Sequence, residues 1–337
     1  MIWVLVLCGG LWLLGDYMKA PKSQRWVMIG GVWLVAFVFF GLPGDLTTDH
    51  AHVWVMATLF GAVGFGYSFL LKRLKERANP PIAPATKPGF RPAELERYAR
   101  HILLREIGGP GQKALKNAKV LVIGAGGLGS PSLMYLAAAG VGVIGVMDDD
   151  VVDASNLQRQ IIHKDQGIGV PKVKSAMEAM TALNPFVEVR PYQRRLDEAS
   201  ADLIGDYDLI LDGSDNFDTR YLVNRVAAKA GKPLISAAIT QWEGQISLYD
   251  PAHGTPCYEC IFPHRPAPGM VPTCAEAGVA APLPGVIGAM MAMEAVKHIT
   301  GAGEGLRGRL MIYDALYADV RVIGIKKRDD CAVCGKS

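Results

Sequence analysis

The sequence has no block of like charges: its 337 residues carry 35 Lys and Arg against 32 Asp and Glu, a net charge of +3. Proteins that bind nucleic acid usually cluster their basic residues, so a nucleic-acid partner is not expected. The N-terminus also lacks the basic start and the small-residue cleavage site of a signal peptide. The length allows one large domain or two ordinary ones.

Hydrophobic residues, by contrast, are abundant, and the excess lies in the N-terminal part of the chain. Residues 2–14, 26–42 and 53–71 are apolar, and the last two stretches approach the roughly 20 residues that cross a bilayer as a helix. Basic residues follow the first and third stretches but are absent between the second and third, which by the positive-inside rule places the C-terminal part in the cytoplasm. We therefore expect a membrane anchor of about three transmembrane helices over residues 1–77.

This anchor predicts an inner-membrane protein whose remaining residues face the cytoplasm. The alternative is a hydrophobic helical hairpin buried within protein. Residues 78–92 contain five prolines and are predicted to form a stiff, extended linker. Residues 93–337 are expected to form a separate domain after this linker.

A strand, a glycine-rich loop and a helix are predicted in succession from residue 120. Residues 120–123 are apolar and mostly β-branched, as in a buried parallel strand. Gly124, Gly126 and Gly129 follow in the spacing G-x-G-x-x-G. Glycines let backbone N–H groups approach a phosphate, and the start of a helix adds partial positive charge. The pattern predicts a nucleotide site.

A second strand supports the same site. Residues 143–147 are apolar and end in Asp148-Asp149-Asp150, roughly 20 residues after the glycines, where an acidic residue binds ribose hydroxyls. This motif alone does not distinguish ATP from NAD, so an NAD-dependent oxidoreductase remains an alternative.

Further along, two segments place charged residues at element ends. Lys172 begins a helix, where a lysine opposes the helix dipole and so indicates an anionic ligand. A strand over 208–211 ends in an acid-rich loop, in which either Asp215 or Asn216 is expected to cap the next helix. Acidic residues at the carboxyl ends of strands lie where open α/β sheets bind ligands.

From residue 232 the pattern changes from parallel βαβ units to strands at 234–239, 244–249 and 310–313. The predicted fold is α/β, with a Rossmann-like, mostly parallel sheet continued by an antiparallel C-terminal part and preceded by transmembrane helices.

Two C-x-x-C pairs lie far apart in the C-terminal part, at Cys257 and Cys260 and at Cys331 and Cys334. Four cysteines in such pairs are typical of a closed tetrahedral zinc site. Two free dithiols or a disulfide are the alternatives. Cys274 lies in a segment rich in Pro and Gly, and is either a nucleophile or sulfur carrier or an inert thiol.

Taken together, several motifs resemble the adenylyltransferases that activate sulfur-carrier proteins for molybdopterin and thiamine synthesis, relatives of the ubiquitin-activating enzymes. The resemblance covers residues 93–337 and is greatest to the bacterial molybdopterin-synthase adenylyltransferases; the N-terminal apolar segment is a departure. The motifs that carry it are Arg97-Tyr98-Ala99-Arg100-His101, the loop from Gly124 to Gly129, residues 155–160, Pro171-Lys172, residues 212–216 and the two cysteine pairs.

The resemblance implies that the C-terminal Gly-Gly carboxylate of a sulfur carrier, the molybdopterin synthase small subunit, attacks ATP in molybdenum cofactor biosynthesis. The products are an acyl-adenylate and pyrophosphate, and a sulfur donor protein later forms the thiocarboxylate. The thiamine-pathway carrier is an alternative substrate. A membrane-tethered scaffold that binds a carrier without turnover is a more distant one.

The resemblance also implies residue roles, with ATP and Mg²⁺ bound at one site and Zn²⁺ at the four cysteines. The nucleotide would be held by the loop glycines Gly124, Gly126, Gly127 and Gly129, by Asp148 and Asp150 at the ribose, and by Asn156, Arg159 and Lys172 at the phosphates. Asp215 would bind Mg²⁺. Arg100 would reach the ATP of a second copy, which implies a homodimer, and Cys274 matches a thiol that some members carry.

Overall fold

The computed structural model describes residues 2–18, 22–41, scattered positions between 56 and 71, 89–267, 270 and 274–335. The chain divides into two compact units, Met1–Pro84 and Ala85–Ser337. The nucleotide and cysteine motifs all belong to the second unit.

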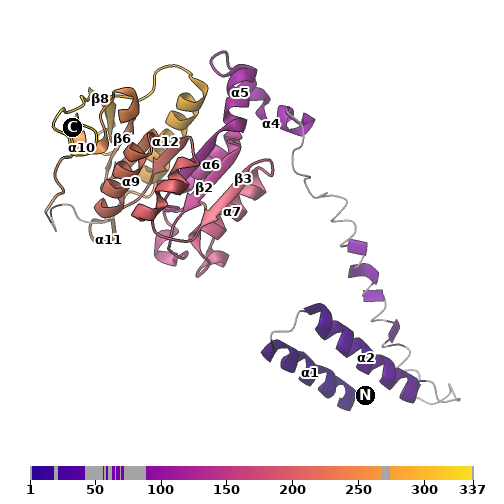
Figure 1. Ribbon diagram of the computed structural model, residues 1–337. Helices are drawn as coiled ribbons and strands as arrows, with labels where there is room; N and C mark the ends of the chain where they lie inside the picture. Colours follow the sequence, from indigo (N-terminus) through magenta and orange to yellow (C-terminus); the bar gives the residue numbers. More distant parts are fainter. Residues whose placement is uncertain are drawn as a thin grey trace. The chain divides into compact units, whose positions relative to one another are not determined.

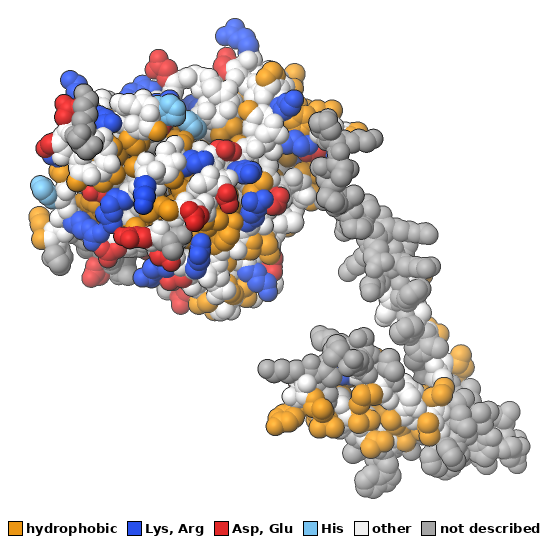
Figure 2. Space-filling view, in the orientation of Figure 1, with side chains coloured by type: hydrophobic (Ala, Val, Ile, Leu, Met, Phe, Trp, Pro, Cys, Tyr) orange, Lys and Arg blue, Asp and Glu red, His pale blue; other side chains and the backbone are white. Residues whose placement is uncertain are grey.

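The first unit contains two helices that lie side by side, α1 (Ile2–Tyr17) and α2 (Lys22–Gly41) (Figure 1). An ion pair of 2.6 Å between Arg25 and Asp16 joins them, and the rings of Trp12 and Trp26 meet edge to face with centroids 5.2 Å apart. Hydrophobic side chains cover much of their described surface (Figure 2).

The expected transmembrane helices, and with them the inner-membrane localisation, are wrong. Within the described residues, no helix combines the length and the hydropathy that crossing a membrane requires. Helix α1 has 16 residues, which is short of the roughly 20 that span a bilayer. Helix α2 has 20 residues, but Lys22 and Arg25 occupy its first turn and shorten its apolar part. The third apolar stretch, residues 53–71, lies largely outside the described residues.

The second unit is built on an eight-stranded sheet of order β3-β2-β1-β4-β5-β6-β7-β8 (Figure 1). The first five strands of the chain pair in parallel and the last three continue antiparallel. The strands are β1 (Lys119–Ile123), β2 (Val143–Met147), β3 (Glu188–Tyr192), β4 (Leu209–Asp212), β5 (Leu234–Ile239), β6 (Glu243–Tyr249), β7 (Arg309–Asp314) and β8 (Asp319–Gly324).

Helices cover both faces of this sheet. The larger core lies beneath α6, α7 and α12, and a second core lies beneath α8 and α9. The helices of the second unit are α4 (Pro92–Ile102), α5 (Gly108–Asn117), α6 (Gly129–Ala139), α7 (Lys172–Leu183), α8 (Ala201–Gly205), α9 (Phe217–Lys229), α10 (Tyr258–Ile261), α11 (Cys274–Ala277) and α12 (Pro282–Thr300).

Strand β1 shows why these residues form a doubly covered strand. Val120 and Val122 belong to the larger core, whereas Leu121 and Ile123 belong to the second. Successive side chains of a strand point to opposite faces, so an uninterrupted apolar run requires cover on both sides.

The strand order reverses at β1, which lies between β2 and β4. The chain runs outward from β1 to β3 on one side and from β4 to β6 on the other. Such a switch point leaves a crevice at the carboxyl ends of the central strands, where α/β sheets bind ligands. The residues that follow β1, β2 and β4 are the glycine-rich loop, the acid triplet and the Asp215 loop.

Candidate functional site

A cavity of about 770 Å³ opens at this switch point. That volume lies within the roughly 300–1,000 Å³ typical of small-molecule sites. Eight of the ten residues predicted to bind the nucleotide line it, namely Gly124, Gly126, Gly127, Asp148, Asp150, Arg159, Lys172 and Asp215. The other two lie beside it, Gly129 at the start of α6 and Asn156 against Arg159.

The glycine-rich loop makes a turn that other residues would not permit. Gly124 has a φ of +93°, in the left-handed region that favours glycine. A Cβ on Gly129 would lie 1.9 Å from the carbonyl oxygen of Gly124. The loop is therefore folded tightly onto the first turn of α6, as the glycine spacing predicts.

Asp148 is tied to the loop beside it. Its Oδ2 accepts the Ala125 N–H at 2.7 Å and its Oδ1 accepts the Asp150 N–H at 2.9 Å. Burial raises the pKa of Asp148, while these two hydrogen bonds act in the opposite direction. Each carboxylate oxygen has a further lone pair, which leaves Asp148 able to accept hydroxyl groups at the cavity.

Lys172 is a buried cation, 4% exposed, at the start of α7. Its Nζ lies 2.8 Å from Oδ2 of Asp150, whose side chain is 62% exposed. A buried ammonium requires an anionic partner. Because the present partner is exposed to solvent, an anionic ligand in the cavity can replace or join it.

Arg159 is the second cation of the predicted phosphate site. Its Nη2 donates to Oδ1 of Asn156 at 2.8 Å. Asn156 ends a short 3₁₀ helix, Ala154–Asn156, whose N-cap is Asp153; the Asp153 side chain accepts the Ser155 N–H. Asn156 therefore orients Arg159 rather than facing the cavity itself.

The loop after β4 resolves which residue caps the next helix. Asn216 is the cap of α9, since its side chain accepts the Thr219 N–H at 2.8 Å. Asp215 is exposed and lines the cavity. Its carboxylate is thus available to a ligand.

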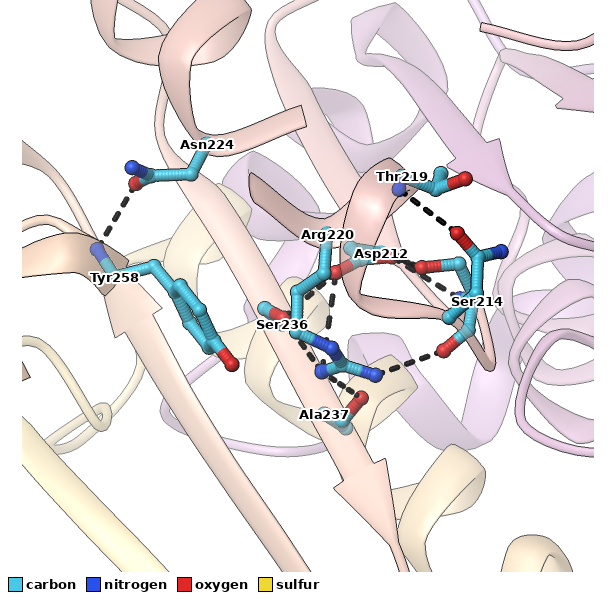
Figure 3. Close-up of polar contacts among 9 residues, drawn as sticks. Asp212, Ser214, Thr219, Arg220, Asn224, Ser236, Ala237 and Tyr258 are labelled. Atoms are coloured by element: carbon cyan, nitrogen blue, oxygen red, sulfur yellow. Dashed lines mark hydrogen bonds and ion pairs between the residues drawn. The ribbon is translucent and has the colours of Figure 1, made fainter. Parts of the chain in front are cut away.

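Beneath this loop lies a buried pair that the sequence analysis missed, Asp212 and Arg220 (Figure 3). The Arg220 guanidinium donates to the carbonyls of Ser214 at 2.8 Å and Ala237 at 2.7 Å. Asp212, fully buried, accepts the hydroxyls of Ser214 at 2.6 Å and Ser236 at 2.8 Å. The pair fixes the loop that presents Asp215 against strand β5.

Helix α9 also contacts the segment that carries the first cysteine pair, through Asn224 and Tyr258 (Figure 3). Asn224 accepts the N–H of Tyr258 at 2.9 Å, directly after Cys257. The Arg220 guanidinium carbon lies 6.0 Å from the centre of the Tyr258 ring, which lines the cavity. One helix therefore contacts both the Asp215 loop and the cysteine segment.

The four predicted metal ligands converge, with all Sγ atoms within 4.8 Å of one another. The Sγ of Cys257 lies 3.9 Å from that of Cys260 and 3.6 Å from that of Cys331, and Cys260 lies 3.4 Å from Cys334. Tetrahedral zinc with Zn–S bonds of about 2.3 Å separates its sulfurs by about 3.8 Å. The cluster fits zinc, and the separations exclude a disulfide bond of about 2.05 Å.

Two predicted catalytic residues lie apart from the cavity or outside what is described. Arg100, on α4, is exposed and does not line the cavity. Cys274 begins α11, but its side chain lies outside the described residues. Ala277 and Gly278, which follow it closely, do line the cavity.

These features agree with comparisons to known proteins. The ThiF family model matches residues 98–333. The chain belongs to the ThiF family. The predicted resemblance to sulfur-carrier adenylyltransferases is confirmed, and so is the predicted class of enzyme, because relatives within this family are named adenylyltransferases.

A Thermus thermophilus relative named "Sulfur carrier protein adenylyltransferase" is 48% identical over 247 residues, 72% of this chain and 91% of its own length. A Haloferax volcanii relative, "SAMP-activating enzyme E1", is 46% identical over 244 residues, which are 72% of this chain and 90% of the relative's length. A Mycobacterium tuberculosis relative, "Probable adenylyltransferase/sulfurtransferase MoeZ", is 52% identical over 69% of this chain, which spans 61% of that relative.

Among solved structures, this ThiF-family chain is similar to E. coli MccB. The TM-score is 0.64 at 23% identity, over 71% of this chain and 75% of the MccB chain. At that identity the similarity establishes the fold, an α/β unit with a mixed sheet.

Proposed function

We propose that this ThiF-family protein adenylylates the C-terminal Gly-Gly carboxylate of a sulfur-carrier protein. The observation that carries the proposal is the cavity at the switch point, where Lys172 and Arg159 meet the glycine-rich loop, with Asp215 at the same cavity. The name of the Thermus thermophilus relative supports the same substrate class.

In the proposed reaction, a carboxylate oxygen of the carrier attacks the α-phosphorus of ATP. The bond from that phosphorus to the oxygen bridging the β-phosphate breaks, which gives an acyl-adenylate and pyrophosphate. Both reactants are anions, so catalysis requires neutralised charge and correct placement rather than proton transfer. Lys172 and Arg159 provide two fixed positive charges for the phosphates.

Asp215 is the proposed Mg²⁺ ligand. Carboxylate oxygens are the ligands that Mg²⁺ prefers, usually together with substrate phosphates. Asp148, Asp149 and Asp150 also lie close together. However, Asp150 pairs with Lys172, Asp149 pairs with Arg195 at 3.2 Å and Asp148 accepts backbone N–H groups. Bound Mg²⁺ would lower the charge of the triphosphate.

We propose that the cysteine cluster holds a structural Zn²⁺. Four thiolates fill a tetrahedral site and leave no position for a substrate. The metal would fasten the C-terminal residues Cys331 and Cys334 to the segment of Cys257 and Cys260. It takes no part in the adenylylation step.

Arg100 and Cys274 complete the proposal. Because Arg100 does not line the cavity of its own chain, contact with a nucleotide requires a second copy, in a homodimer. Cys274 lies three residues before the cavity-lining Ala277, and its thiol is a candidate for later chemistry with a sulfur donor protein. The carrier is proposed to be the molybdopterin synthase small subunit, with the thiamine-pathway carrier as the alternative.

The decisive experiment is ATP–pyrophosphate exchange by the full-length protein with Mg²⁺, given each carrier separately. Exchange with the molybdopterin carrier alone is expected. Exchange with the thiamine carrier alone would change the pathway but keep the chemistry. ATP binding without exchange in the presence of either carrier would contradict the proposed function.

A further inference from the structure

His163 is a buried histidine that the proposed reaction does not use. It is 6% exposed and lies between the segment of Arg159 and helix α7. Its Nε2 is 2.9 Å from the carbonyl oxygen of Ala125, in the glycine-rich loop, and its Nδ1 is 3.0 Å from Oγ of Ser175 on α7.

The partners determine the tautomer. A carbonyl oxygen only accepts hydrogen bonds, so Nε2 must carry the hydrogen and donate it to Ala125. In the neutral ring Nδ1 then accepts the hydroxyl hydrogen of Ser175. Burial lowers the pKa of His163, which favours this neutral form.

The two peptides that flank Ala125 are oriented by side chains from two different segments. Asp148 holds the N–H of Ala125 and His163 holds its carbonyl. In a trans peptide the carbonyl and the following N–H point in opposite directions, and the structure contains no cis peptide among its described residues. The Gly126 N–H therefore points away from His163.

Gly126 lines the cavity, and within the described residues its N–H makes no hydrogen bond. A free backbone N–H at a glycine-rich loop is a donor for an acceptor oxygen of a nucleotide. The ring of His163 also joins three elements that carry predicted nucleotide ligands: the loop itself, the segment of Arg159, and α7 with Lys172.

We propose that His163 is a positioning residue of the nucleotide site, whose Nε2–H holds the Ala125 carbonyl so that the Gly126 N–H donates to bound nucleotide. The proposal rests on the proposed function only for the identity of that nucleotide as ATP. It assigns no proton transfer to His163.

Two substitutions separate the ring nitrogens. The amide nitrogen of Gln extends as far as Nε2, so His163→Gln can still donate to Ala125. The amide of Asn reaches only to the position of Nδ1, so His163→Asn keeps contact with Ser175 and loses Ala125. Both variants are polar and neutral, and His298→Asn on α12, another histidine whose pKa burial lowers, is the matched control.

The readout is the Kd of ATP with Mg²⁺, measured by isothermal titration calorimetry on the full-length protein. One lost hydrogen bond predicts about tenfold weaker binding for His163→Asn. His163→Gln and His298→Asn are expected to remain within about threefold of the original protein. Equal losses for Asn and Gln, or no loss for Asn, would overturn the proposal.

Two further measurements keep the result interpretable. If His163→Asn does not fold, as judged by circular dichroism, the Ser175→Ala variant tests the proposal instead. This substitution removes the hydrogen bond to Nδ1 and should weaken ATP binding about threefold. Unchanged binding would contradict the proposal.

In the adenylylation assay, His163→Asn should raise the KM for ATP but not for the carrier. Titration needs no carrier, so a protein that binds ATP but fails pyrophosphate exchange refutes the proposed function alone.

Discussion

The nucleotide side of the second unit and its cysteine cluster are both assembled from distant segments, but by different forces. On the nucleotide side, the sheet brings the ends of β1, β2 and β4 together, and hydrogen bonds such as Asp148 to Ala125 then fix the loops. The cysteine cluster has a small core of its own, formed by the cysteines and a few neighbours. With the proposed Zn²⁺ bound, its four sulfurs would be held together mainly by the metal ion.

Because of this difference, substitutions at the two sites should have different effects, on activity at one and on folding at the other. Loss of one ligand on the nucleotide side should impair chemistry while the fold persists, because the sheet positions the remaining groups. If the cluster holds the proposed Zn²⁺, loss of one cysteine should impair folding of its region, because the binding energy of a structural metal is folding energy.

The largest expected effect is on activity, from Asp215→Ala. The carboxylate is exposed on the cavity and holds no helix end, so its removal should not lower the thermal unfolding midpoint. Loss of a group that organises charge in the transition state predicts adenylylation lowered by about 10³-fold. Pyrophosphate exchange measures the adenylylation activity, and differential scanning calorimetry measures the unfolding midpoint.

Asp218→Ala is the control for this prediction. Asp218 is an exposed acid in the first turn of α9 and pairs with Arg265. Exchange by this variant should stay close to that of the original protein. Equal losses in both variants would remove Asp215 from the proposed metal role.

The second prediction concerns stability, through Cys331→Ser. The variant should lose zinc, measured by mass spectrometry of the metal, and unfold at a lower temperature. If the site contributes about 3 kcal/mol, the midpoint falls by roughly 6–12 °C for a unit of this size. ATP binding should weaken far less than in the His163→Asn variant.

Cys8→Ser provides the matched control, since Cys8 is a buried cysteine of α1, in the other unit. Its zinc content should equal that of the original protein. Absence of zinc from the original protein would refute the metal assignment itself.

The two sites also differ in how far the sequence predicts them. Local patterns identified β1, the glycine turn and the acids that follow β2, because strand, turn and helix signals act over a few residues. The C-x-x-C pairs were found for the same reason, since each pair is a local motif. Their convergence followed from the chemistry of zinc rather than from any property of the intervening chain.

Contacts that depend on neighbouring strands could not be predicted in this way. The partners of Arg220 include Ser236 and Ala237 on β5, which are adjacent only after the sheet forms. Strand β8 was also missed: its side chains are mostly exposed, so its Val-Arg-Val alternation marks no buried face. The prediction of a membrane anchor was wrong because it rested on the hydrophobicity of whole stretches. The helices in those stretches are short, as in α1, or begin with charged residues, as in α2.

Arg220 lies between the two sites and supplies the last prediction, in which the expected effect on ATP binding is smaller than that of His163→Asn. Arg220→Met leaves Asp212 buried without its cation, and breaking such a pair costs about 3–5 kcal/mol. The variant should bind ATP several-fold more weakly, since the Ser214 carbonyl loses its donor and the Asp215 loop is freed, yet it should retain zinc.

Arg220→Lys should restore little of the ATP affinity, because a single ammonium cannot reach the two carbonyls as the guanidinium fork does. Arg225→Met, on the same helix but 44% exposed, is the control and should alter neither property. Zinc loss in Arg220→Met would instead mean that α9 couples the two sites. The hydrogen bonds of the nucleotide side and the metal binding of the cysteine cluster would then stabilise one cooperative unit.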